Sequence, residues 1–151
     1  MNAQKKYRLH HSIGYHLSIA ARMQERRLDD WMRPMGLTRT TWCILLAVAN
    51  EDLTRPSEIA DFVGIDRTAT SRALRSMEEA GLVSRRSAST DRRMTEVSLS
   101  QKALDLVAQG TPMAVENNSL ITEQLNDSES AELYRLLKKS LEGKERGLKQ
   151  L

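Results

Sequence analysis

Donors of hydrogen bonds gather in one stretch of this 151-residue sequence, from Arg67 to Arg93. The stretch holds seven arginines and three acidic residues, a net +4, whereas the whole chain carries +3, so the remaining residues sum to −1. No lysine lies in it, although the chain has seven elsewhere. Guanidinium groups bind phosphate and the guanine edge through paired hydrogen bonds. A basic island on a nearly neutral chain is typical of a nucleic-acid-binding surface.

The first half of the island is predicted to be a helix between Asp66 and Gly81. Asp66 can accept from the free N–H groups of the first turn, and Gly81 can adopt the left-handed conformation that ends a helix. Helical spacing predicts a core-facing stripe of Ala69, Ala73, Met77 and Ala80, with Leu74 beside them. The other face would carry Arg67, Thr68, Thr70, Ser71, Arg72 and Arg75. Such a helix suits the major groove of DNA, but a merely solvated face explains the helix alone equally well.

The residues before this helix favour the DNA-binding interpretation. Thr38 or Thr41 can cap a helix that runs to Asn50, and Pro56 fits the first turn of a helix over 56–63. In the latter, Ile59 and Phe62 are expected to face inward. Gly64 closes it, so two helices are joined by a short glycine-containing turn. That arrangement indicates a helix-turn-helix.

A hairpin is predicted after Gly81. Residues 82–86 form a short apolar-to-basic strand, 87–93 a polar turn, and 94–99 an alternating strand. The tip is basic, as in the wing of a winged helix. Arg85 and Arg86 lie on the first strand, and we expect them mostly to meet phosphate.

Helices are expected on both flanks. Residues 9–32 carry an apolar stripe that Pro34 ends, and Ser100 caps a helix that Gly110-Thr111-Pro112 should kink or break. Asp127 or Ser128 would cap a last helix with leucines at 133, 136, 137 and 141. A small winged domain cannot cover these stripes, which suggests an interchain bundle. The expected fold is mainly α with a small β-hairpin wing, a single domain over 1–151. Within it, 37–100 would form the DNA-binding lobe, and 1–34 with 101–151 the dimerisation helices.

From about residue 37 to 103 the sequence resembles the MarR family of bacterial transcription regulators. The match lies in Arg55-Pro56-Ser57-Glu58-Ile59-Ala60, in 65–72 and 77–85, and in Asp91-Arg92-Arg93 followed by Val97-Ser98-Leu99-Ser100. The resemblance implies a homodimeric repressor that binds near-palindromic double-stranded DNA and is released by a small aromatic or anionic ligand. It also implies that Arg93 enters the minor groove, that Asp91 orients it and that Ser57 contacts the backbone. The expected DNA-binding set is Ser57, Arg67, Thr68, Thr70, Ser71, Arg72, Arg75, Arg85, Arg86, Asp91, Arg92 and Arg93.

Other kinds of site are poorly supported. The single Cys43 excludes an internal disulfide, and its apolar neighbours favour an inert core thiol over a redox sensor. His10, His11 and His16 lack metal-ligand spacing, so no metal or cofactor is expected, and no catalytic arrangement indicates an enzyme. A ligand pocket is expected where the first, second and fifth helices meet, with His10, Tyr15, Trp31, Met35, Trp42 and Met113 as candidates.

Two alternatives to a MarR-like regulator stay open. One is a winged-helix protein-interaction module without DNA binding, and a lesser one is a winged regulator with a different dimer interface. No apolar run could span a membrane, and residues 1–9 lack the core of a signal peptide, so the cytoplasm is expected.

Overall fold

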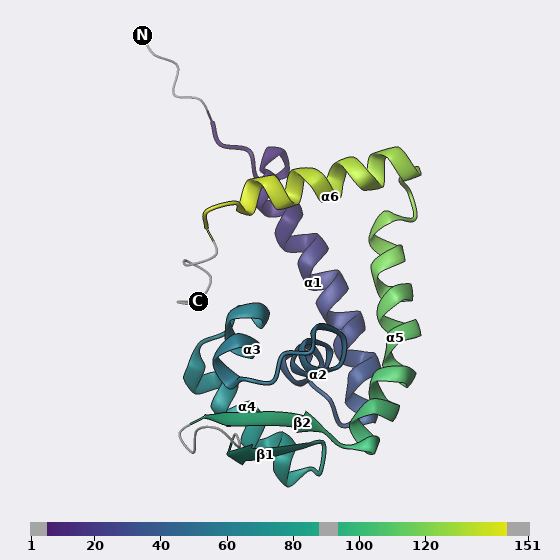
Figure 1. Ribbon diagram of the computed structural model, residues 1–151. Helices are drawn as coiled ribbons and strands as arrows, with labels where there is room; N and C mark the ends of the chain where they lie inside the picture. The colour runs from purple at the N-terminus through teal and green to yellow at the C-terminus, as the bar shows by residue number, and fades with distance from the viewer. Residues whose placement is uncertain (1–5, 88–93, 145–151) are drawn as a thin grey trace.

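The computed structural model describes residues 6–87 and 94–144, which form a set of helices with one hairpin at the edge of the molecule (Figure 1). The elements are α1 (Ile13–Met32), α2 (Arg39–Glu51), α3 (Pro56–Val63), α4 (Arg67–Glu79), β1 (Val83–Ser87), β2 (Thr95–Leu99), α5 (Gln101–Thr122) and α6 (Asp127–Leu141). Two 3-10 turns, Leu9–His11 and Arg33–Met35, flank α1. None of the helices in the described ranges is long and apolar enough to cross a bilayer.

Side-chain caps fix where most helices begin. Thr38 caps α2, and Thr41 completes a capping box with it, so both residues proposed for this end take part. The first helix begins later than residue 9, because a 3-10 turn precedes it and the Ser12 hydroxyl accepts from the N–H of Tyr15 at 3.3 Å. The sequence prediction for α6 was wrong by at least one residue. Asn126 is its cap, because its side chain and that of Glu129 each accept from the other's main-chain N–H, at 3.0 and 2.9 Å.

The core lies inside the lobe made by α2, α3, α4 and the hairpin. Ile44 and Leu45 of α2, Ile59 of α3, and Leu74 and Met77 of α4 are all buried there. These side chains lock the helix-turn-helix against the helix behind it.

Phe62 was expected in this core and is not; it is 55% exposed. The inward side of α3 carries Ile59, Ala60 and half-buried Val63, and at 100° per residue Phe62 lies roughly 100° away from their mean direction. Gly64, at φ 79°, then closes α3 in the left-handed conformation that a side chain would strain.

The hairpin pairs antiparallel, with Val83 opposite Leu99 and Ser87 opposite Thr95. Val97 ties it to the lobe, because its side chain is buried and its N–H donates to the Thr54 carbonyl, which precedes α3, at 2.8 Å. The wing therefore starts from a fixed base beside the helix-turn-helix.

The helix break that Gly110-Thr111-Pro112 could have caused is absent, because α5 is one helix with Pro112 inside it. Gly110 serves close packing instead: a Cβ there would lie 2.7 Å from the Trp42 ring of α2. The Thr111 hydroxyl donates to the Val107 carbonyl at 2.7 Å. Packing on α1 and α2 holds the helix together where glycine and proline in isolation favour a break.

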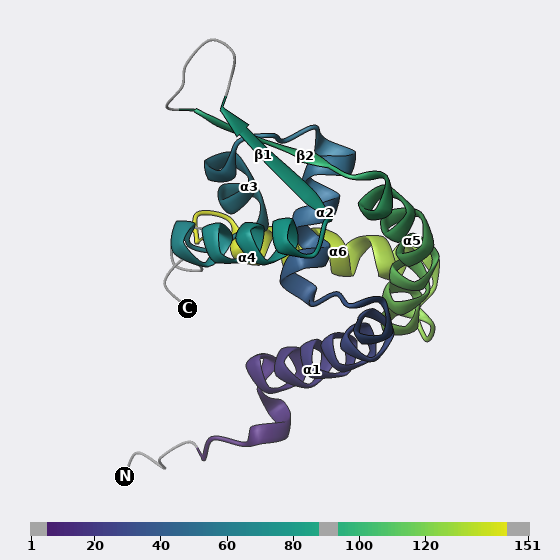
Figure 2. The same cartoon turned by 90° about the horizontal axis from the view of Figure 1, so that it is seen from below.

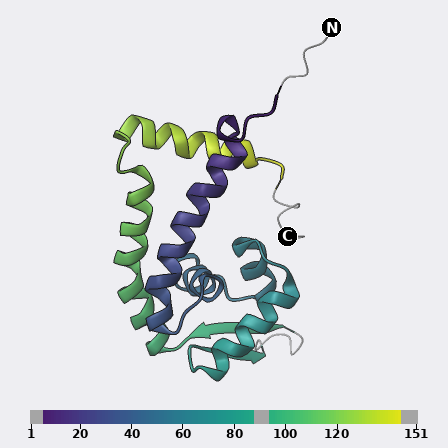
Figure 3. The ribbon, with the colours of Figure 1, turned by 180° about the vertical axis from the view of Figure 1, so that it is seen from behind.

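Outside the lobe the molecule is open. In Figures 1 and 3, α5 and α1 rise from the lobe, and α6 crosses at the far end of α5. Only Leu28 and Met32 of α1 are buried, and in α6 no residue is. Seen from below, the first half of α1 and α6 lie apart (Figure 2), and α6 makes at most marginal contacts with the other described elements.

Candidate nucleic-acid interface

The exposed face of α4 presents a compact set of donors. The Asp66 carboxylate accepts from the Ala69 N–H at 2.7 Å and so sets the start of the helix. Beyond it five residues of the expected set are exposed, as predicted: Arg67, Thr68, Ser71, Arg72 and Arg75. Short and long donors thus share one face of a narrow helix, which is the arrangement that can contact base edges and phosphates in a major groove.

Thr70 does not belong to this face. It is 1% exposed, and its hydroxyl donates to the Asp66 carbonyl at 2.9 Å. The buried stripe of α4 consists of Thr70, Leu74 and Met77, spaced i, i+4, i+7. In the predicted stripe, Ala69 and Ala73 are only half-buried and Ala80 is exposed. The prediction placed the small apolar residues inward and therefore assigned the wrong side to Thr70.

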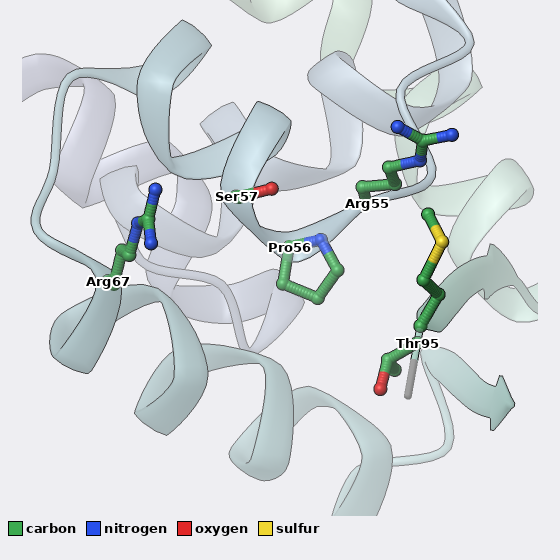
Figure 4. Close-up of a pocket in the computed structure, with 6 residues that line it drawn as sticks. Arg55, Pro56, Ser57, Arg67 and Thr95 are labelled. Atoms are coloured by element: carbon green, nitrogen blue, oxygen red, sulfur yellow. The ribbon is translucent and has the colours of Figure 1, made fainter. Parts of the chain in front are cut away.

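A hollow of about 350 Å³ adjoins this face, lined by Arg55, Pro56, Ser57, Arg67, Met94 and Thr95. Figure 4 shows Ser57 between Arg55 and Arg67, which come from the starts of α3 and α4. Arg55 precedes α3 and provides no side-chain cap, so the first N–H groups of α3 lack one. Two guanidinium groups, a hydroxyl and a helix N-terminus around one hollow suit an anionic oxygen such as a backbone phosphate.

The two arginines in the described part of the wing have different surroundings. Arg86 is exposed, as a phosphate contact requires. Arg85 instead lies against Glu78 of α4, with Nη2 2.6 Å and Nε 3.0 Å from Oε2. Hydrogen bonding from the Arg85 side chain is the main reason that the pKa of Glu78 lies below its ordinary value. Arg85 is thus already paired within the protein, and its expected contact with phosphate stays a prediction. Asp91, Arg92 and Arg93 lie outside the described residues.

Sequence reasoning missed two residues around the end of α4. Glu78 is one, and Lys102 of α5 is the other, since its Nζ donates to the Ala80 carbonyl at 3.0 Å. A cation near the last carbonyls of a helix stabilises that end. No spacing rule predicts either contact, because the Glu78–Arg85 pair crosses a turn and the Lys102–Ala80 bond spans the whole hairpin.

The six ligand-pocket candidates are not gathered in one place. His10 and Tyr15 form an edge-on ring pair, with centroids 5.0 Å apart, at the N-terminal end of α1. Trp31 lies about 24 Å further along that helix, beneath the guanidinium of Arg27. Met35 packs against the core, Trp42 is buried against Gly110, and Met113 is half-buried in α5. The candidates thus fall into two groups, one at each end of α1.

The thiol and the histidines show no arrangement for chemistry. Burial raises the pKa of Cys43, which the nearby Arg39 charge only partly offsets. Across residues 6–87 and 94–144, no three His, Cys, Asp or Glu side chains are grouped so that they could hold a metal ion.

Comparison with known proteins finds one family model and several solved structures that are similar to this chain. A family model described as the MarR family matches residues 35–94. The transcriptional regulator SlyA has a TM-score of 0.82 and 19% identity, over 91% of this chain and 96% of that one. A mutant MarR from E. coli, complexed with operator DNA, has a TM-score of 0.78 and 23% identity, over 85% of this chain and 93% of that one. BpsR from Bordetella bronchiseptica, whose DNA binding is regulated by 6-hydroxynicotinic acid, has a TM-score of 0.83 and 19% identity, over 91% of this chain and 99% of that one. The mainly helical fold with a hairpin wing is confirmed.

Proposed function

We propose that this chain is a member of the MarR family, whose members are transcription regulators and not enzymes, and that it is a homodimeric repressor of transcription. It would bind a near-palindromic operator on double-stranded DNA in the cytoplasm and leave it when a small ligand binds. The observation that carries the proposal is the exposed donor face of α4 beside the hollow that holds Ser57. The DNA complex of the E. coli relative supports it.

Within this face the residues differ in what they would contact. Arg67, Thr68 and Ser71 lie in the first two turns of α4, the part that enters the groove deepest when such a helix docks. We assign these three to base edges. Arg72, Arg75 and Arg86 would neutralise phosphates, together with Ser57 and the first turn of α3. Arg92 and Arg93 would extend the contacts into the minor groove, with Asp91 orienting Arg93.

The dimer would be built by residues 1–34 and 101–151, leaving 37–100 to the DNA. The support is apolar surface that the chain leaves open. In α1, Ile13 is 79% and Leu17 45% exposed, and in α6, Leu136 is 48% and Leu141 49% exposed. Apolar surface on this scale, on three helices that protrude from one lobe, indicates a partner. Two copies related by a twofold axis would present two α4 helices to successive major grooves.

The proposal includes a small aromatic or anionic effector. The relative regulated by 6-hydroxynicotinic acid favours it. In this chain the junction of α1, α2 and α5 is where such a ligand would act, because those helices connect the dimer arms to the lobe.

Binding-site selection from random duplex DNA tests the proposal. The parent should enrich a near-palindrome with half-site centres about one helical turn apart. Arg67→Ala should cost about 1–3 kcal/mol and relax one position of the consensus. Arg86→Ala should weaken all sequences alike and lower the slope of log K against log salt by about one. If the parent enriches nothing, a winged-helix module that binds protein is the better account; an unchanged consensus for Arg67→Ala removes Arg67 from the base contacts.

A further inference from the structure

One carboxylate joins the C-terminal turn of α4 to the first strand of the wing. Glu78 accepts three hydrogen bonds from Arg85: from the main-chain N–H at 3.2 Å, from Nε at 3.0 Å and from Nη2 at 2.6 Å. Both side chains are partly shielded, at 38% exposed for Glu78 and 29% for Arg85. A paired guanidinium–carboxylate contact with an added main-chain bond has one geometry, unlike a loose surface ion pair.

The chain between these residues makes a tight reversal. Gly81 adopts a φ of 71°, and the Leu82 N–H donates to the Met77 carbonyl at 2.9 Å as α4 ends. The strand that follows carries Arg85 two residues after Val83, where β1 begins. The main-chain bond to Glu78 fixes how far β1 lies from α4, and the guanidinium bonds fix its direction. The same carboxylate therefore sets the angle between helix and wing.

We propose that Glu78 is a positioning residue for DNA binding, which holds the wing at the angle where wing and α4 engage one operator together. Arg85 is its counterpart in the protein and not a phosphate contact. The inference rests on the proposed function, since it concerns how the two DNA-contacting elements are combined. It adds a specificity-determining pair that touches no base.

Charge and geometry predict opposite changes in operator affinity when Glu78 is removed. On charge alone, the loss of an acidic group beside a DNA-facing surface strengthens binding to a polyanion at every sequence, and it frees Arg85 for phosphate. On geometry, a loosened wing must be ordered again on binding, so the operator loses affinity while non-specific DNA does not. The sign of the change at the operator therefore decides between them.

Glu79 supplies a matched control. It lies on the same turn and is exposed, and its side chain makes no hydrogen bond or ion pair among the described residues. Glu78→Ala and Glu79→Ala thus remove the same charge from neighbouring places. Titrated against the operator selected by the parent, Glu78→Ala should bind roughly tenfold more weakly, whereas Glu79→Ala should bind equally or slightly more tightly. Against scrambled DNA both should match or slightly exceed the parent.

A charge-preserving variant keeps the test decisive if Glu78→Ala folds poorly. Glu78→Asp keeps the charge and shortens the reach to Arg85, so it should also weaken operator binding, whereas a pure charge effect leaves it unchanged. In an Arg85→Met background, Glu78→Ala should cause little further loss, because the two residues act through one contact. At saturating protein, Glu78→Ala should lose the flanking minor-groove protection that a hydroxyl-radical footprint records. It should keep the protection under α4 that a separate methylation footprint records.

The outcomes separate this inference from the proposed function. A parent that selects no operator overturns the proposed function and this inference with it. A parent that selects an operator, with Glu78→Ala and Glu78→Asp binding it as well as or better than Glu79→Ala, overturns the positioning role alone.

Discussion

Neighbouring hydroxyls of α4 have different tasks. Thr70 is buried and bonded to the Asp66 carbonyl, whereas Ser71 is exposed on the donor face. Thr70→Val removes one buried hydrogen bond and leaves the donor face intact, so it should lower the free energy of unfolding by about 1 kcal/mol and leave the selected consensus unchanged. Ser71→Ala should leave the free energy of unfolding unchanged and alter the selected consensus. Denaturant titrations with binding-site selection on both variants check this; a changed consensus for Thr70→Val contradicts the assignment.

Cys43 is expected to be unreactive in the folded protein. Because burial raises the pKa of its thiol, less thiolate is present at neutral pH than for an exposed cysteine. Alkylation by iodoacetamide at pH 7 should be slow in the native protein, fast in denaturant, and faster as the pH rises toward the raised pKa. Mild peroxide should leave DNA binding unchanged in the parent, as in Cys43→Ala. Peroxide-sensitive binding that Cys43→Ala abolishes would assign this thiol a redox role.

Residue types were easier to predict than residue directions. The sequence identified the donors on α4, because arginines, threonines and a serine between a capping Asp66 and Gly81 are visible in the chain itself. It misassigned Thr70, because Ala69 and Ala73 seemed better core residues and the helix phase depends on what packs behind it. Glu78 was not predicted, because its partner Arg85 lies beyond the end of the helix, across a turn that helical periodicity does not describe.

At the scale of elements, the contact between α2 and α5 depends on a missing side chain. A methyl group at Gly110 would lie 2.7 Å from the buried Trp42 ring, so Gly110→Ala forces the helices apart. Overpacking of this kind costs about 1–3 kcal/mol, more than the roughly 1 kcal/mol that alanine's helix propensity returns. Urea denaturation should show a net loss of stability. Gln109→Ala, at an exposed neighbouring position, should be neutral or stabilising.

Elements with a strong local signal were predicted nearly to the residue. Pro56–Val63 agrees with the expected third helix, and Ser100 caps α5 as expected. The break at Pro112 was wrong because local signals describe an isolated helix, whereas α5 is held by the elements that pack on it. The cap at Asn126 was missed because three capping residues follow one another there, and only the geometry selects one.

At the scale of the whole molecule, truncation of α6 tests the proposed dimer. Deletion from Leu133 onward removes the exposed leucines of this helix, so the product should be monomeric or aggregated and bind operator weakly, because one α4 then meets one half-site. Sedimentation at several concentrations, with DNA titration, measures both effects. A truncated protein that stays dimeric and binds like the parent would place the dimer contacts elsewhere.

The winged fold could be predicted from sequence because its periodicity, caps and turn glycines agree with one another. The position of α6 could not, since it buries no residue and makes at most marginal contacts with the other described elements, whereas only the last turns of α1 join the core. The packing of Trp42 against Gly110 has an optical consequence. Its indole should emit at shorter wavelength than that of half-exposed Trp31. In a Trp31→Phe variant, Trp42 would be the single remaining tryptophan and would lie where α2 meets α5, so its emission during ligand or DNA titration would report whether that contact moves.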